Sequence, residues 1–259
     1  MKSGIYRVKL LYTEKMKEAK IGLLVLFFVA LFFFLFFDIV YATPVGPDNV
    51  VIESNMTKGS LGAYVLNISG GRVAVINLSS TIQNTRWKAF IGRVTGSFTL
   101  DDASGSTVYD WALSSIGGEV YATRNSSTIN WNNLTCASVA SLNLENTRLS
   151  HTSPADNLTV TFNVSSGATH REFFVASRNI SQNSCPTLNT YVNNNTQDSV
   201  FEEVALYEAI GSNIVYATIL EQDAAGYDGR PYDFQMIVPE VGTPGWDGAT
   251  AYYLYVELS

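Results

Sequence analysis

Cys136 and Cys185 are the only two cysteines in this sequence of 259 residues. An even pair in an exported chain favours a disulfide, and both cysteines lie beyond an N-terminal segment with the features of an export signal. The bond would close a loop of about fifty residues and contribute roughly 4 kcal/mol by restricting the unfolded chain. The alternative is a pair of buried thiols. Two cysteines are too few for a four-cysteine metal site.

Asparagine is the second residue type with a recognisable chemistry, because Asn-x-Ser/Thr (a sequon) is the acceptor motif for N-linked glycans. Asn, Ser and Thr are also common in turns and on wet strand faces. On an exported chain the sequons predict glycosylation of an exposed surface, and Asn77 and Asn163 fall on the polar faces of predicted strands. The nine sequons begin at Asn55, Asn67, Asn77, Asn125, Asn133, Asn157, Asn163, Asn179 and Asn194.

The remaining reactive residue types do not form a recognisable active site. The sequence contains no Gly-x-Ser-x-Gly motif. His151 and His170 fall in polar, loop-like contexts, where surface or turn positions are expected rather than a general base or a metal ligand. The adjacent acids Asp101 and Asp102 would point to opposite faces of a strand. We therefore expect a non-enzymatic protein without catalytic residues, cofactors or bound metal.

Two loops offer weaker chemical possibilities. Asp223, Asp228 and Asp233 supply the oxygen atoms that calcium prefers, but their spacing differs from that of an EF-hand loop. A solvated hairpin loop is the favoured interpretation. Trp246 lies in a loop rich in Gly and Pro and could stack on a sugar, although an anchoring contact with the domain is favoured over carbohydrate binding.

The charge of the chain excludes some functions and is unevenly distributed. The chain is 46% apolar, only 15% charged, and carries a net charge of −7. This composition excludes a disordered chain, and the acidic balance argues against a nucleic-acid partner. Beyond residue 42, ten basic and twenty acidic residues remain, so this part has a net charge near −10.

Residues 1–42 have the three parts of a secretory signal: a basic head, an uncharged run over residues 21–37, and Val40 and Ala42 at positions −3 and −1 of a predicted cut before Thr43. At ~1.5 Å per residue the run spans about 25 Å, close to the lower limit for a membrane helix. Retention as an anchor is therefore the alternative, with the membrane as a partner through residues 21–37. A pilin-type retained helix is a further alternative. Translation from Met16 would leave a shorter signal.

The exported part, residues 43–259, is predicted to be a single all-β domain. Short β-branched and aromatic stretches alternate with turn residues, which is typical of an antiparallel β-sandwich or jelly roll. Trp87 and Trp111 lie in two of these stretches and are expected in the core, whereas residues 136–142 could form a short helix or crossover. The predicted strands are Val50–Glu53, Ala63–Ile68, Arg72–Leu78, Trp87–Gly92, Gly96–Leu100, Val108–Leu113, Glu119–Ala122, Leu158–Val164, Glu172–Ser177, Phe201–Glu208, Ile214–Glu221, Tyr232–Val238 and Tyr252–Leu258.

Four segments, residues 87–96, 201–207, 215–218 and 232–240, resemble uncharacterised archaeal exported surface proteins. The resemblance extends over most of the exported domain. It implies an archaeal cell envelope and N-glycosylation there, and it carries no activity.

These features predict an N-glycosylated, non-enzymatic protein of the cell surface or extracellular space, with a structural or adhesive role. Its expected partners are further copies of itself or other envelope proteins, and not nucleic acid. Residues 49–53 could complete a neighbour's sheet by strand addition, although pairing within their own domain is favoured. The alternatives are a pilin-like filament subunit and a secreted carbohydrate-binding or hydrolytic module.

Overall fold

The computed structural model describes residues 42–259 except for residues 60–61, 64, 163–167, 194 and 197–199. The chain divides into two units after residue 41, and only the second unit, residues 42–259, is described. The described part is mostly β-structure with antiparallel sheets, which confirms the predicted all-β class. None of its helices is long and apolar enough to cross a membrane. The uncharged run over residues 21–37 lies outside the described residues.

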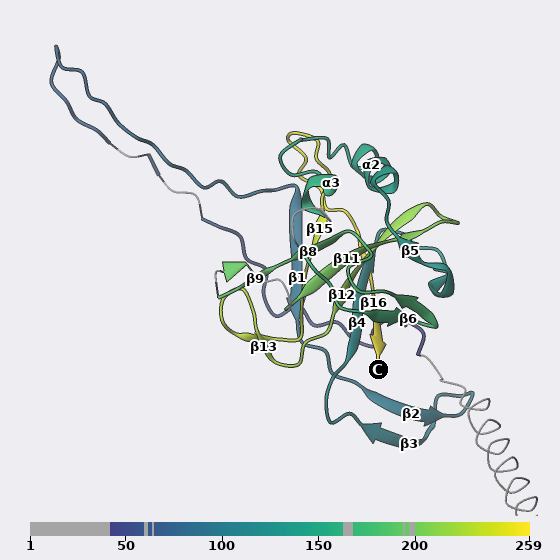
Figure 1. The fold of residues 1–259 in the computed structure, drawn as a ribbon. Helices are drawn as coiled ribbons and strands as arrows, with labels where there is room; N and C mark the ends of the chain where they lie inside the picture. The colour runs from purple at the N-terminus through teal and green to yellow at the C-terminus, as the bar shows by residue number, and fades with distance from the viewer. Residues whose placement is uncertain (1–41, 60–61, 64, 163–167, 194, 197–199) are drawn as a thin grey trace, which may run out of the picture. The chain divides into compact units, whose positions relative to one another are not determined.

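An antiparallel sheet forms the centre of the domain (Figure 1). Most residues of its three inner strands are buried. Both faces of the sheet are therefore covered, which explains why these strands carry buried apolar residues on both sides instead of alternating with exposed polar ones. In spatial order the strands are β16 (Tyr253–Leu258), β4 (Gly118–Thr123), β12 (Asn213–Ile219), β11 (Glu202–Glu208) and β5 (Thr135–Cys136), with β8 (Thr187–Asn189) also paired to β11.

One face of the sheet is covered by a two-stranded ribbon and two helices. The ribbon pairs β1 (Trp87–Gly92) with β15 (Phe234–Pro239), and the helices are α2 (Val139–Arg148) and α3 (Leu158–Thr161). Tyr216 of the sheet packs here in one cluster with Met236, Leu142 and Phe162. Full burial of a side chain of this size contributes about 1.5–3 kcal/mol.

The other face is covered by smaller elements, the 3-10 helix η1 (Trp131–Asn133) and the ribbon formed by β6 (Phe173–Val175) and β7 (Arg178–Ile180). The Trp131 ring lies 5.1 Å from the ring of Tyr121 in β4. Phe173 and Ile180 extend the same apolar cluster. The sheet is thus the middle of three layers.

The two helices show where local signals decided between helix and strand. Ser138 caps α2 in a capping box with Ser141, so the ambiguous segment over residues 136–142 leads into a helix. The strand predicted over Leu158–Val164 is wrong, because residues 158–161 form α3. Asn157 caps this helix, and Leu158 and Phe162 are both buried at the i, i+4 spacing of a helix face.

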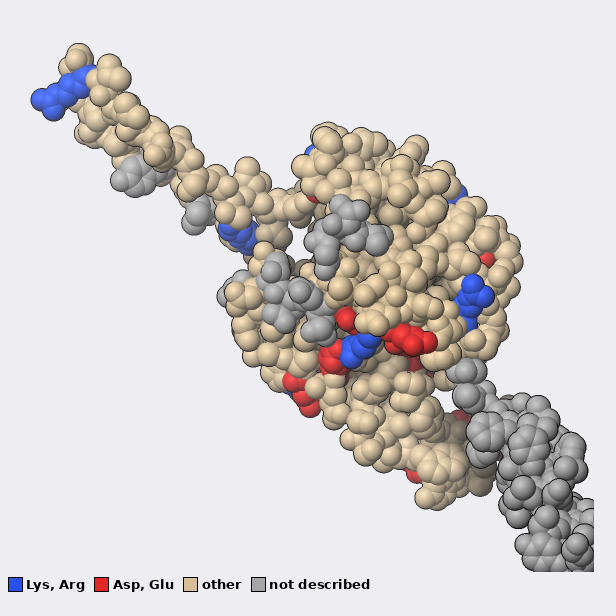
Figure 2. All heavy atoms as spheres, viewed as in Figure 1, with Lys and Arg blue, Asp and Glu red and all other residues tan. Residues whose placement is uncertain are grey.

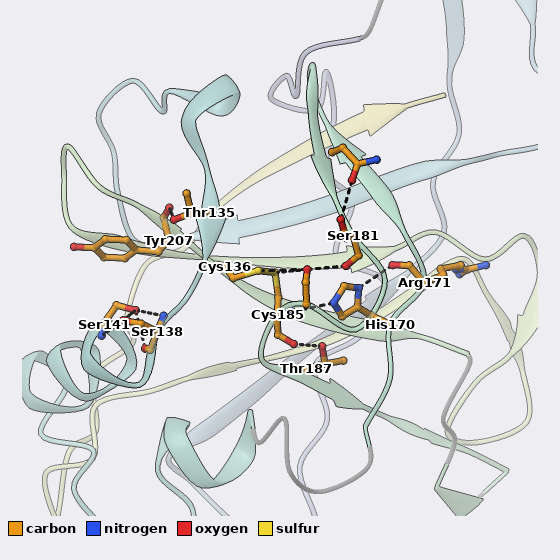
Figure 3. The surroundings of a disulfide bond; sticks show 12 residues. Thr135, Cys136, Ser138, Ser141, His170, Arg171, Ser181, Cys185, Thr187 and Tyr207 are labelled. Carbon is orange, nitrogen blue, oxygen red and sulfur yellow. Dashed lines mark hydrogen bonds between the residues drawn. A yellow bond between two sulfur atoms is a disulfide. The ribbon is translucent and has the colours of Figure 1, made fainter.

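The predicted disulfide is confirmed between Cys136 of β5 and Cys185 (Figure 3). His170 lies beside it, and the backbone N–H of Cys185 donates to His170 Nε2 at 3.1 Å. The other ring nitrogen, Nδ1, donates to the Arg171 carbonyl at 2.8 Å. The bond joins the edge strand β5 to the segment that leads into β8.

Three further ribbons lie outside the central sheet. They are β2 (Ser97–Asp101) with β3 (Thr107–Ala112), β9 (Tyr191–Val192) with β10 (Asn195–Thr196), and β13 (Ala224–Ala225) with β14 (Pro231–Tyr232).

Residues 49–83, here called the arm, leave the domain as two extended legs (Figures 1 and 2). All of the described arm residues are exposed. The legs meet at a turn where Gly71 has a φ of +76°, and Lys58 Nζ donates to the Thr81 carbonyl across them at 2.9 Å. The strands predicted over residues 50–53, 63–68 and 72–78 are wrong for the described residues of these stretches, none of which belongs to a strand.

The disulfide predicts a measurable loss of stability in the double variant Cys136→Ser/Cys185→Ser. Removing the closure of a loop between residues 49 positions apart should cost about 4 kcal/mol in the free energy of unfolding, because the unfolded chain regains entropy. Denaturant titration of both proteins measures this difference. An unchanged unfolding midpoint would contradict a stabilising role, and wild-type protein with reductant is the matched control.

Candidate functional site

The two histidines, for which surface or turn positions are expected, are both buried, so a surface position is wrong for each. His151 Nε2 donates to the Arg86 carbonyl at 3.1 Å, and the ring packs edge-on against Trp87. Burial lowers the pKa of His151, which favours the neutral ring. His151 and His170 are therefore held by backbone groups inside the domain, and neither faces an open site.

The acidic loop forms the hairpin of β13 and β14, as the favoured interpretation predicted. Its three aspartates do not converge. The buried Asp233 accepts from the backbone N–H groups of Val94 and Asp223, whereas Asp228 pairs with Arg230. Among the described residues no group of three or more His, Cys, Asp or Glu is arranged to hold a metal ion.

Two buried carboxyl groups are the strongest candidates for acid–base chemistry. Glu119 of β4 lies directly opposite Glu257 of β16. Burial and the neighbouring charge of Glu257 raise the pKa of Glu119 to about 8. Glu257 accepts from the Tyr121 hydroxyl at 2.8 Å and from the Ala176 backbone N–H at 2.9 Å. Glu119 and Glu257 are both buried, so the pair lies within the core.

The sequons occupy different environments. The side chain of Asn157 caps α3 by accepting from the Val160 backbone N–H at 3.0 Å, and Asn125 is also partly buried. Asn163 and Asn194 lie outside the described residues. The exposed sequons are Asn55, Asn67, Asn77, Asn133 and Asn179, and the first three belong to the arm.

The arm has the most unusual surface in the domain, because its described residues expose twelve large apolar side chains. Val73 is 95% exposed and Val75 is 94% exposed, so neither contacts the domain. Monomeric soluble proteins rarely leave so many neighbouring apolar groups in water without a binding partner. The twelve are Val50, Val51, Ile52, Met56, Val65, Leu66, Ile68, Val73, Val75, Ile76, Leu78 and Ile82.

The second leg of the arm is fixed where it joins the domain. Asn84 donates from its side chain to Asp156 at 2.8 Å, and the Arg86 guanidinium pairs with the same carboxylate at 3.1 Å. The Trp87 ring nitrogen donates to the Asp156 carbonyl at 2.9 Å. These contacts hold the leg just before it enters β1.

A second exposed apolar surface lies on the ribbon of β2 and β3. Phe98 is paired with Trp111 and Leu100 with Tyr109, so all four side chains share one face of the ribbon. Each is between 42% and 58% exposed. The prediction that Trp111 lies in the core is therefore wrong. We call these four side chains the hairpin face.

The edge strand β16 is partly protected. Val45 and Val256 exchange two backbone hydrogen bonds of 3.0 and 2.8 Å. The segment before the arm therefore pairs with its own domain, but at residue 45 and not at residues 49–53. Pro47 has no N–H group and cannot continue this ladder along β16.

The hairpin face and the arm illustrate what the sequence did and did not reveal. Apolar and aromatic residues correctly marked the two strands of the ribbon but wrongly marked strands in the arm, and in neither place did they show that the apolar side chains would lack a partner within the domain. Three of the four residues of the hairpin face are aromatic, which was the available signal for an exposed binding surface.

The raised pKa of Glu119 predicts stability that depends on pH. Between about pH 4.5 and pH 8 the folded state keeps a proton that the unfolded state releases, so the free energy of unfolding falls as pH rises. The variant Glu119→Gln should reduce this fall, because the amide stays neutral. Burial also raises the pKa of Glu203, which leaves part of the slope in place.

Thermal melting between pH 5 and pH 8 measures this effect. The control is Glu53→Gln, which removes an exposed carboxylate from the arm. A slope in Glu119→Gln equal to that of the wild type would contradict the assignment.

In comparisons with known proteins, the chain matches no family model, and it has no significant match among curated proteins or solved structures.

Proposed function

We propose that this chain is a non-enzymatic structural subunit of a cell surface or secreted assembly, and that its copies associate through the arm. The observation that carries the proposal is the exposure of the arm, above all of Val73 and Val75. Burying such side chains against a partner is favourable by about 25 cal/mol for each Å² removed from water.

The partner must come from outside the domain. Both faces of the central sheet are already covered by the two apolar clusters. Within the described residues the second leg is attached to the domain through Asn84 and Arg86, and the arm itself stays in solvent. An isolated two-legged arm is marginal in water, because one pair of extended chains cannot bury its own side chains. Another copy of the same protein is an available partner, because every arm is accompanied by one domain.

The proposal includes the finer expectations from the sequence. The domain is proposed to be an exported β-sandwich in which the ribbon of β1 and β15 is a narrow second sheet. Glycans on the arm would suit a surface protein, since Asn55, Asn67 and Asn77 are exposed there. The buried or internally paired state of both histidines and of Asp233 favours a structural role over a hydrolytic one.

The arm predicts assembly that depends on its apolar side chains. The variant Val73→Asp/Val75→Asp should associate at least about tenfold more weakly than the wild type, because burying two charges opposes the contact. Sedimentation velocity at about 1–100 μM covers the range expected for an interface of modest size. The sample is the full chain as the cell exports it, purified from the medium or extracted from membranes in mild detergent.

The matched control is Ser80→Asp/Gln83→Asp, which adds the same charge at exposed polar positions of the same leg. This control should assemble like the wild type. Equal assembly of all three proteins, or a wild type that stays monomeric at the highest concentration, would refute the proposed function.

The environments of the sequons predict which sites carry glycans. Glycopeptide mass spectrometry should find glycans at Asn67 and Asn77, where the side chains are free in solvent, and none at Asn157, whose side chain caps α3. As a control on the cap, Asn157→Gln should destabilise the fold by about 1 kcal/mol, whereas Asn77→Gln should not. A fully occupied Asn157 would contradict the prediction.

A further inference from the structure

The arm and the ribbon of β2 and β3 are attached to opposite ends of one strand. The arm leads into β1 at Trp87, and the chain leaves β1 at Gly92 and enters β2 at Ser97 (Figure 1). Six residues of strand separate the two ends by about 20 Å. The molecule therefore carries two exposed apolar features on different sides of its core.

The base of the ribbon is fixed, like the base of the arm. Gly96 lies against the Leu258 side chain of β16, which would have to shift to admit a side chain at residue 96. At the other end of the ribbon, Asp102 accepts hydrogen bonds from the Ser104 hydroxyl and from the backbone N–H of Ser106, which shape the turn. The hairpin face thus lies on a ribbon that has contacts at both of its ends.

The two features have opposite charges. Residues 65–83, here called the distal arm, contain one charged residue, Arg72, next to the turn. The ribbon contains Asp101, Asp102 and Asp110 and no basic residue. Figure 2 shows basic charge at the tip of the arm, whereas the visible acidic side chains lie on the rest of the domain. In a domain with a net charge near −10, a basic tip will be attracted to an acidic ribbon.

We infer that the hairpin face is the acceptor for the distal arm of a second copy of this chain. This inference rests on the proposed function and names the surface to which the arm binds. Val73 and Val75 lie against the rings of Phe98 and Trp111, and Arg72 lies close to the acidic end of the ribbon. In this contact apolar side chains meet apolar side chains, and a basic residue meets acidic ones. The edge of β16, part of which pairs with Val45, takes no part in it.

Capture of the arm by its own ribbon is disfavoured by the fixed base of the arm. From the contact between Lys58 and Thr81, the arm reaches about 35 Å away from the core. To reach its own ribbon it would have to reverse at residues 84–86, which Asp156 holds in place. A donor at one end and an acceptor at the other make a heterologous contact, and repetition of that contact gives an open chain of subunits.

The size of the hairpin face limits the expected affinity between two copies. Half-exposed aromatic and leucine side chains leave roughly 400 Å² of apolar surface in water, about half of what one partner buries in a standard stable interface. An interface of this size is typical of weak, transient contacts, so reversible assembly is expected.

Complementation between two defective copies tests the inference. One copy keeps the arm but carries Phe98→Ser/Trp111→Ser, and the other keeps the hairpin face but has residues 65–83 replaced by a short Gly-Ser linker. Each copy alone should be monomeric, and an equimolar mixture should form dimers and nothing larger. All proteins are prepared as full exported chains, and sedimentation velocity with circular dichroism measures assembly and folding.

The matched control is Val108→Ser, which removes an exposed apolar side chain from the same ribbon but from the face opposite Tyr109 and Trp111. It should assemble like the wild type. In addition, Arg72→Glu should weaken assembly about two- to fivefold, the range for a solvent-exposed ion pair.

The outcomes separate the two proposals. If the Phe98→Ser/Trp111→Ser copy alone still assembles, or if the mixture gives no dimer, the hairpin face is not the acceptor, while the arm can still be the donor. If the copy without residues 65–83 still assembles by itself, the proposed function fails as well. Binding of the wild type to neutral phosphatidylcholine vesicles that is lost in Phe98→Ser/Trp111→Ser, with assembly unchanged, would assign the hairpin face to a lipid surface and overturn the inference.

Discussion

The burial of the central sheet on both faces determines what the rest of the chain can do. Tyr216 and Tyr121 lie on opposite sides of the sheet, and each packs into its own apolar cluster. Once the ribbon of β1 and β15 covers one side and η1 with β6 and β7 covers the other, no sheet face remains for further β-structure. The arm and the hairpin face are therefore left in solvent by the fold itself, and an apolar surface left in this way is stabilised by association.

The same double burial explains the polar groups inside the domain. Glu119 and Glu257 sit opposite each other on neighbouring strands of a covered sheet, so burial raises the pKa of both. The Arg124 guanidinium binds both carboxylate oxygens of Glu145, at 2.7 and 2.8 Å, and so joins the end of β4 to α2. These residue types can perform catalysis in an open cleft, but here they join layers of the core.

The sequence predicted the strands of the core well, but it gave no strand order and no strand partners. Trp87–Gly92 matches β1, because β-branched and aromatic residues fit a pleated surface wherever it lies. The same signal predicted a strand over residues 72–78 and a core position for Trp111, and the structure shows neither. An alternation of apolar residues indicates which side chains are more stable when buried, but it does not indicate whether the surface that covers them belongs to the same molecule. The strand predicted from Leu158 is wrong for a different reason. Residues 158–161 fit both the strand pattern and the helix pattern, and the Asn157 cap decides in favour of the helix.

An exposed apolar arm also carries a risk, because extended chains with unpaired backbone groups aggregate through their edges. Two features of the chain limit that risk. Val45 occupies part of the edge of β16, and Pro47 cannot extend the pairing. Asn67 and Asn77 place hydrophilic side chains, and potential glycans, among the apolar residues of the distal arm. A large glycan would keep the arm in solution and would also limit how closely a neighbour can approach. Under the proposed function, glycosylation and assembly would therefore act on the same residues in opposite directions, and the fraction of occupied sequons on the arm would set how many copies can join.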